Sequence, residues 1–395
     1  MKRTMIFITG IYDTLDLFTE QLKQSFYQLG CHTFTYYAGS GDEGKEALQE
    51  LLETSAESAA CVTFNNLGYN LEIIPGNGEQ PVNIWEYYNV CYINILMDHP
   101  FHFKRPLASA PTTSVVLCTD QNHVRYIRRF YKNIKKTEFL PHAGVELGHR
   151  HKPLAERGID VLYAGALPVY TVGRMIPDLD SIPETDGSDM AKAVLEELVQ
   201  HPWKTTEEVV EDYLRDQCND ISDERIAQII VKMRFLDSYA TSFFREQAVR
   251  ILVENGISVT AYGVGWDQCE WSGNPYLTCG GKVLAPQILP LMNDAKIILN
   301  TNTWFKAGAH DRIFNGMLAK AAVVSDGSDY LNRVCHDGDE LVLFSLEQIT
   351  KLPERVCQLF GNLDETQAMA DRGYEYAQKN HTWVQRAEYI YGELM

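Results

Sequence analysis

The stretch that decides the fold is GAHDRIFNGMLAKAAVVSDGSDYL, which runs from Gly308 to Leu331. Apolar residues recur in it at helical spacing, which predicts a helix beginning near His310, and 322–324 is typical of a buried parallel strand. Another apolar strand, 295–300, lies just upstream and ends in polar residues. Because ligands bind at the carboxyl ends of strands in open α/β sheets, this helix is expected to begin at a ligand-binding crevice.

The amino end of this helix is a candidate anion site. Its unpaired N–H groups and the helix dipole favour negative charge. Asp311 is the expected cap, and His310 and Arg312 add donors suited to a diphosphate. The alternative is an ordinary strand–helix–strand unit with an arginine on its surface.

Composition restricts the possible functions. A chain of 395 residues predicts two or three domains, and a net charge of −18 argues against nucleic acid or an anionic membrane as partner. Nine cysteines are scattered without a Cys-x-x-Cys pair, which favours reduced thiols and no structural metal site. No signal peptide or run of ~18 apolar residues is apparent, so we expect a soluble cytoplasmic protein without a transmembrane segment.

Two α/β patterns follow one another. The first, 1–150, opens with strand 4–9, a helix and strand 32–37, and is expected to finish with a short strand at 139–144. It lacks the glycine fingerprint of a dinucleotide site. A polar stretch, 146–158, is interpreted as a linker, and a second pattern restarts at 160 and continues to 380.

Polar residues at one strand end of the first domain are candidates for catalysis. Strand 90–97 is followed by Asp98, His99 and Pro100, and a carboxylate beside an imidazole at a strand end is a candidate general base. The alternative is that Asp98 caps a turn and His99 is simply satisfied by hydrogen bonds.

Glycines in the second domain mark places where a backbone can approach a ligand. Gly165 follows strand 160–165, where its N–H could meet a phosphate, although a plain tight turn explains it equally well. Gly263 and Gly265 follow strand 257–262 with Trp266 behind them.

Between these strands lies an insert, about 178–250, that is strongly acidic. Its stretch 178–225 carries fifteen Asp or Glu against four Lys or Arg, so we interpret it as a solvated face and assign it no chemistry. Thr205 and Glu208 form a capping-box pattern, and one long helix is expected over 223–254.

Several motifs together resemble a known family. They are the Tyr262-Gly-Val-Gly-Trp strand end, the His310-Asp-Arg-Ile-Phe-Asn helix start, Val323-Val-Ser-Asp, and His381-Thr-Trp with Arg386. This pattern, strong only from Ile257 onward, resembles the spore maturation protein CgeB-like glycosyltransferases, whose carboxyl domain is of the glycosyltransferase family 1 type.

The resemblance implies an α/β protein of GT-B architecture, with two facing Rossmann-like domains built on parallel sheets. Domain 1–150 would hold the acceptor, domain 151–380 the nucleotide sugar, and a last helix, 381–395, would pack back towards the first domain. Residues implied to bind the donor are Tyr262, Gly263, Gly265, Trp266, Val283 near the base, and Asn300, Thr301 and Asn302 along the cleft. His310, Asp311 and Arg312 would face the diphosphate.

Two positions depart from the family pattern. Asn315 stands where many GT-B enzymes use a Glu to bind the ribose, and Ala307 stands where retaining relatives carry a second Glu. The resemblance therefore assigns no stereochemistry.

The expected function is transfer of a sugar from a nucleotide sugar, with UDP as the expected nucleotide, to a hydroxyl of a carbohydrate, protein or small molecule. We expect no metal and no cofactor besides this co-substrate, since the Asp178-Leu-Asp180 and Asp337-Gly-Asp339 pairs do not follow buried strands. The alternatives are a sugar-nucleotide epimerase, or a relative that binds carbohydrate or nucleotide without catalysis.

Overall fold

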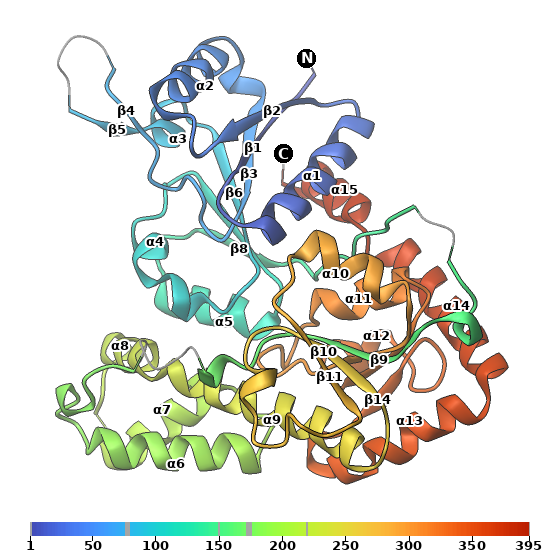
Figure 1. Cartoon of the computed structure of the whole chain (residues 1–395). Coiled ribbons are helices and arrows are strands. Elements are labelled where there is room, and N and C mark those ends of the chain that lie inside the picture. Colours follow the sequence, from blue (N-terminus) through green and yellow to red (C-terminus); the bar gives the residue numbers. More distant parts are fainter. Residues whose placement is uncertain (1, 76–79, 149–150, 171–175, 219, 395) are drawn as a thin grey trace. The chain divides into compact units, whose positions relative to one another are not determined.

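The computed structural model describes residues 2–75, 80–148, 151–170, 176–218 and 220–394 (Figure 1). The chain divides into two compact units, 1–145 with 381–395, and 146–380. Each unit is built on its own six-stranded sheet, and every strand pair in both large sheets is parallel. The predicted α/β class with parallel sheets is confirmed.

The sheet of the first unit has the order β2-β1-β3-β6-β7-β8. Its strands are β1 (Thr4–Thr9), β2 (His32–Tyr37), β3 (Ala59–Phe64), β6 (Cys91–Leu96), β7 (Ser114–Cys118) and β8 (Lys136–Phe139). The helices are α1 (Asp13–Gln28), α2 (Gly41–Ser55), α3 (Ile84–Tyr87), α4 (Lys104–Ala108), α5 (Gln121–Phe130) and α15 (Trp383–Glu393). β4 (Glu72–Ile73) and β5 (Val82–Asn83) form a separate antiparallel pair. The central strands β3 and β7 are buried at every residue, as in parallel sheets covered on both faces.

The predicted strand 139–144 is wrong. The strand at this edge, β8, ends at Phe139, and beyond it only Gly144 forms an isolated bridge, to Thr382. Pro141 has no N–H to donate to a sheet, and the carbonyl groups of Pro141 and His142 accept instead from Arg386.

The last helix, α15, is anchored to the first unit by the motif that begins at His381. Trp383 packs against the rings of Phe18 and Phe64, with centroids 5.1 and 5.4 Å away. Arg386 donates to Pro141 O at 2.6 Å and to His142 O at 2.7 Å. These residues of the motif therefore hold the last helix in place.

The sheet of the second unit has the order β11-β10-β9-β12-β13-β14. Its strands are β9 (Ile159–Ala164), β10 (Val259–Tyr262), β11 (Leu277–Gly281), β12 (Ala295–Asn300), β13 (Ala322–Asp326) and β14 (Val342–Phe344). Its helices are α6 (Gly187–Gln200), α7 (Thr206–Gln217), α8 (Asp223–Met233), α9 (Phe235–Glu254), α10 (Ala285–Met292), α11 (Asp311–Leu318), α12 (Leu331–Val334), α13 (Leu352–Gly361) and α14 (Leu363–Asn380).

Helix α11 connects the neighbouring parallel strands β12 and β13, as predicted. It packs closely on the sheet, because a Cβ added at Gly316 would lie 3.0 Å from Val323 and 3.1 Å from Ile298. Glycine at this position therefore lets α11 lie close to strands β12 and β13.

The insert differs from its prediction. The expected single helix over 223–254 is two helices, α8 and α9, that meet at Arg234. The two helices pack against different neighbours: α8 packs against α7, whereas α9 packs against α6 and α13. The capping box of Thr205 and Glu208 is confirmed at the start of α7. The insert is also more than a solvated face, since α6 to α9 bury apolar side chains such as Val194 and Ile229.

No helix in the described ranges is both long enough and apolar enough to cross a membrane.

Candidate anion-binding site

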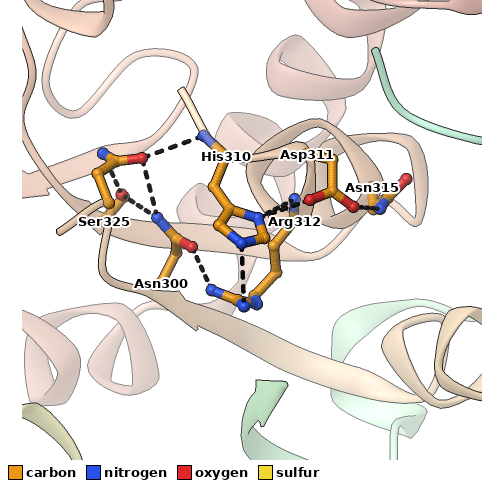
Figure 2. Close-up of polar contacts among 7 residues, drawn as sticks. Asn300, His310, Asp311, Arg312, Asn315 and Ser325 are labelled. Atoms are coloured by element: carbon orange, nitrogen blue, oxygen red, sulfur yellow. Dashed lines mark hydrogen bonds and ion pairs between the residues drawn. The ribbon is translucent and has the colours of Figure 1, made fainter. Parts of the chain in front are cut away.

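Arg312, the second residue of α11, is a buried cation at the carboxyl end of the sheet of the second unit. Only 5% of it is exposed, and its Nη1 donates to Asn300 Oδ1 at 2.6 Å (Figure 2). Its guanidinium carbon lies 5.3 Å from the centroid of the Tyr163 ring. Burial lowers the pKa of Arg312, and the positive charge of Arg245 lowers it further.

Arg245, in the middle of α9, is a second buried cation in the same region. It is 5% exposed, its Nη1 donates to Ala166 O at 2.6 Å, and its guanidinium carbon lies 5.3 Å from the centroid of the Trp304 ring. Its Nε is buried without a hydrogen-bond partner. Across the part of the chain that the structure describes, neither Arg245 nor Arg312 has a carboxylate within ion-pair distance.

The two guanidinium groups converge on the loop that begins at Gly165. A Cβ added at Gly165 would lie 3.0 Å from Arg312 Nη2 and 3.5 Å from Arg245 Cζ. Buried cations without a carboxylate partner are unfavourable, and two of them repel each other. An anion bound at this place would relieve both unfavourable contributions, so we treat the arrangement as a candidate anion-binding site.

Sequence reasoning missed Arg245. The insert was assigned no chemistry because acidic residues dominate it, and a helical pattern does not reveal which distant loop a buried arginine meets. One signal was present, since Arg245 lies between buried Phe244 and buried Ala248 on a helix with many apolar positions.

His310 occupies the N-cap position of α11, so the prediction that Asp311 is the cap is wrong. His310 Nδ1 lies 3.2 Å from the N–H of Arg312 and 2.6 Å from Asp311 Oδ1, while its Nε2 lies 3.4 Å from Arg312 Nη2 (Figure 2). One nitrogen cannot accept from the amide and donate to the carboxylate together. The shorter contact and the guanidinium at Nε2 favour a proton on Nδ1, a tautomer that frees the Arg312 amide for a ligand.

The three polar residues at the end of β12 lie behind Arg312 and not at an open surface. Asn300, Thr301 and Asn302 are all 0–1% exposed. Asn300 bridges Arg312 and Ser325, Thr301 shares a 2.9 Å hydrogen bond with Tyr163 Oη, and Asn302 Oδ1 accepts from the N–H of His310. These residues fix the position of Arg312 and of the loop before α11.

Asp326 adds a buried carboxyl group to this cluster. Its Oδ1 accepts from the N–H of Asn302 at 2.5 Å, and burial raises its pKa to about 6. With this pKa, the carboxyl group of Asp326 is mostly protonated below pH 6 and mostly ionised at neutral pH.

The glycines predicted to approach a ligand approach other loops. The N–H of Gly165 donates to Tyr262 O at 2.8 Å, which fits the alternative of a plain turn, and its contact with a phosphate stays a prediction. Gly263 has φ 130°, and a Cβ there would lie 2.6 Å from the backbone of Gly165. Gly265 has φ 105°, and its Cβ would lie 2.6 Å from the ring of Tyr170.

The other predicted donor residues are spread around this centre. Trp266 is 1% exposed, and its Nε1 donates to Gly165 O at 2.8 Å, so it holds the loop from behind. Tyr262 ends β10, and Val283 lies half-buried in the loop between β11 and α10. Asn315 is buried one turn into α11 and donates to Asp311 Oδ2 at 3.0 Å (Figure 2).

Asp98 and His99 lie in the first unit, after β6. His99 is 4% exposed, its ring stacks on Phe101 at 3.7 Å, and its Nδ1 accepts from the N–H of Phe101. Burial lowers the pKa of His99 well below its usual value. Asp98 is more accessible, and its Oδ2 accepts from Asn65 Nδ2 at 2.9 Å. Of the two candidates, Asp98 is the more exposed to solvent.

The two Asp-x-Asp pairs have other partners. Asp337 pairs with Arg355 and Asp339 with Arg372, each at 2.5 Å. Asp178 caps a short helical turn by accepting from the N–H of Asp180. The described residues also contain one group with metal-ligand spacing, His336, Asp339 and Glu340, of which the first two are exposed. None of these carboxylates contacts Arg245 or Arg312.

Two units that each carry a six-stranded parallel sheet form the GT-B architecture, which the solved structures similar to this chain share. HepE from Anabaena, solved with UDP and glucose, has a TM-score of 0.53, 10% identity and coverage of 99% of both chains. Sucrose-phosphate synthase from Thermosynechococcus elongatus has a TM-score of 0.54, 11% identity and coverage of 100% of this chain and 99% of that one. A glycosyltransferase from Rickettsia africae has a TM-score of 0.52, 10% identity and coverage of 99% and 98%.

Residues 241–392 match the family model described as glycosyl transferase-like. The chain therefore contains a glycosyltransferase domain, and the predicted enzyme class is confirmed. No curated protein matches the chain in sequence.

Proposed function

We propose that this chain transfers a sugar from a nucleoside diphosphate sugar to an acceptor hydroxyl, with UDP as the nucleotide. The observation that carries the proposal is the pair of buried guanidinium groups, Arg245 and Arg312, that converge on Gly165 without a carboxylate partner. When the sugar leaves, negative charge develops on the diphosphate, and fixed cations in a site without water stabilise it strongly. The complex of HepE with UDP and glucose supports UDP as the nucleotide, because the two chains share a fold.

The diphosphate would receive charge-assisted hydrogen bonds from both guanidinium groups and one from the amide of Arg312 at the start of α11. Two arginines then supply the positive charge that a divalent cation supplies in other phosphate sites. The proposal therefore includes metal-independent transfer. Turnover that persists in excess EDTA supports it, and turnover that is lost and then restored by added Mg²⁺ contradicts that part.

Asp98 is the proposed general base. It would take the proton of the acceptor hydroxyl as that oxygen bonds to C1 of the sugar and the bond from C1 to the β-phosphate oxygen breaks. The assignment of the chain to the CgeB-like group of glycosyltransferases is part of the proposal and rests on the motifs after Ile257.

Two measurements test the proposed function. Saturating UDP should raise the melting temperature, because a ligand at 100 times its Kd stabilises the folded state by ~2.7 kcal/mol. UDP should then be released from UDP-glucose, or another UDP-sugar of a small panel, only when an acceptor is present. Interconversion of the UDP-sugar without release of UDP points to an epimerase. UDP binding without turnover for any acceptor points to a non-catalytic relative.

A further inference from the structure

The loop between β12 and α11, residues 301–310, is held in a conformation that its own sequence does not favour. Thr303 in this loop has φ 45°, a left-handed conformation that is rare for a β-branched residue. Thr303 is 5% exposed, and its Oγ1 is buried without a hydrogen-bond partner, as is Nε1 of Trp304. Such a backbone persists only where the surrounding structure fixes it, and it occurs often at functional sites.

The helical insert makes the contacts that fix this loop from one side. Lys306 Nζ donates to Pro202 O at 2.5 Å, in the turn between α6 and α7. At the start of α7, Thr206 Oγ1 donates to Asp237 Oδ1 of α9 at 2.8 Å. Lys306, Thr206, Asp237 and Thr303 surround a cavity of about 10 Å³, the size that holds a single water molecule.

The same insert helix also holds the loop on the other side of the anion site. Ser242 Oγ accepts from the N–H of Val169 at 2.8 Å, and Arg245 Nη1 donates to Ala166 O at 2.6 Å. Helix α9 thus contacts the loop after β9 through Ser242 and Arg245, and it approaches the 301–310 loop through Asp237 and, at Trp304, through Arg245. Both loops therefore contribute groups next to the two guanidinium groups: Gly165 and Ala166 in the loop after β9, and Trp304 and His310 in the 301–310 loop.

We propose that the insert acts as a brace that holds the 301–310 loop in the conformation that binds the donor, with Lys306 and Asp237 as positioning residues. The proposal rests on the proposed function, because it takes the pair of Arg245 and Arg312 as the diphosphate site. It gives the acidic insert a role in donor binding, through the few contacts that it makes with this loop, although most of its charges face solvent.

The proposal is tested by replacing Lys306 and measuring hydrogen exchange in the 301–310 loop. Lys306→Met keeps the aliphatic stem and removes the donor to Pro202 O. Hydrogen exchange of residues 301–310, followed by mass spectrometry, should become ~10-fold faster, and the affinity for UDP should fall ~10-fold. Lys306→Arg, which keeps a cationic donor, should recover both. Lys152→Met is the matched control, since Lys152 belongs to an exposed pair with Asp294 and should change neither quantity.

Thr206→Val gives a second route to the same question, because it removes the hydroxyl that donates to Asp237. It should accelerate exchange in 301–310 as well. Exchange and UDP affinity equal to wild type in both variants would overturn the proposal, and so would exchange that rises equally throughout the second unit. If the wild-type chain binds no UDP, the proposed function fails, whereas the exchange comparison still decides whether the insert holds the loop.

Discussion

Replacing either site arginine by methionine should weaken donor binding strongly while leaving the folded chain about as stable as before. In Arg245→Met the diphosphate loses one or two charge-assisted hydrogen bonds, each worth roughly 1.5–3 kcal/mol. A loss of about 2–4 kcal/mol corresponds to UDP binding that is weaker by about 30-fold to 1,000-fold. The free energy of unfolding changes little, because the lost bond to Ala166 O, about 1 kcal/mol, is offset by removal of a buried unpaired cation. Arg312→Met should behave alike.

Arg157 is the matched control for this experiment. It is also a buried arginine, 3% exposed, and burial lowers its pKa to about 10. Its guanidinium is satisfied by the carbonyls of Lys152, Ala295 and Ala319, at 3.0, 2.8 and 3.0 Å. Arg157→Met should therefore lower the free energy of unfolding by roughly 3 kcal/mol or more, since three buried acceptors lose their donor, without changing UDP affinity in the folded chain.

Isothermal titration with UDP and urea unfolding without ligand measure the two quantities for all three variants. The reasoning is refuted if Arg245→Met and Arg312→Met bind UDP as wild type does. It is also refuted if they lose stability as Arg157→Met does, because the two arginines would then be structural groups.

Three further predictions follow from other residues. Asp98→Asn should lower kcat by ~10²–10⁴-fold while UDP affinity stays the same, and unchanged kcat would exclude Asp98 as the base. Burial raises the pKa of Asp326 from its ordinary 3.8 to about 6, so the group binds its proton more tightly in the folded chain. Its stabilising contribution is therefore complete below pH 3.8 and is lost as pH rises through 6. Asp326→Asn should thus exceed wild type in stability by up to roughly 3 kcal/mol at pH 7.5 and approach it at pH 4, and an equal difference at both pH values would contradict this. Gly263→Ala should destabilise the second unit by more than 1 kcal/mol in urea unfolding, because its Cβ meets the Gly165 backbone at 2.6 Å and φ is 130°, whereas Gly361→Ala, which has open space, should not.

Much of the fold could be predicted because buried parallel strands appear as short apolar runs. Strands such as β12 and helix α11 were found close to their observed bounds. The break between α8 and α9 could not be found, because apolar spacing is helical on both sides of Arg234 and the change lies in which helices each part packs against. The strand expected at 139–144 failed because pairing with β7 stops after the N–H of Leu140 donates to Cys118 O, and Pro141 has no N–H to continue it.

Within the candidate site, the sequence led to the residues next to the strand ends and missed the one that arrives from the insert. Arg312 and His310 could be found because they follow β12 and begin α11. Arg245 lies 67 residues before Arg312 in sequence, and only the fold brings its guanidinium to Gly165. Likewise, Asn300 and Asn302 were expected along the cleft, although their burial behind Arg312 depends on how the loop folds back over β12 and β13.

A crystal structure of the chain with UDP bound tests the central claim most directly. We expect diphosphate oxygens within about 2.7–3.2 Å of the guanidinium nitrogens of both Arg245 and Arg312, and of the Arg312 amide. A diphosphate bound elsewhere, with both guanidinium groups still facing the Gly165 loop without a ligand, would contradict the account.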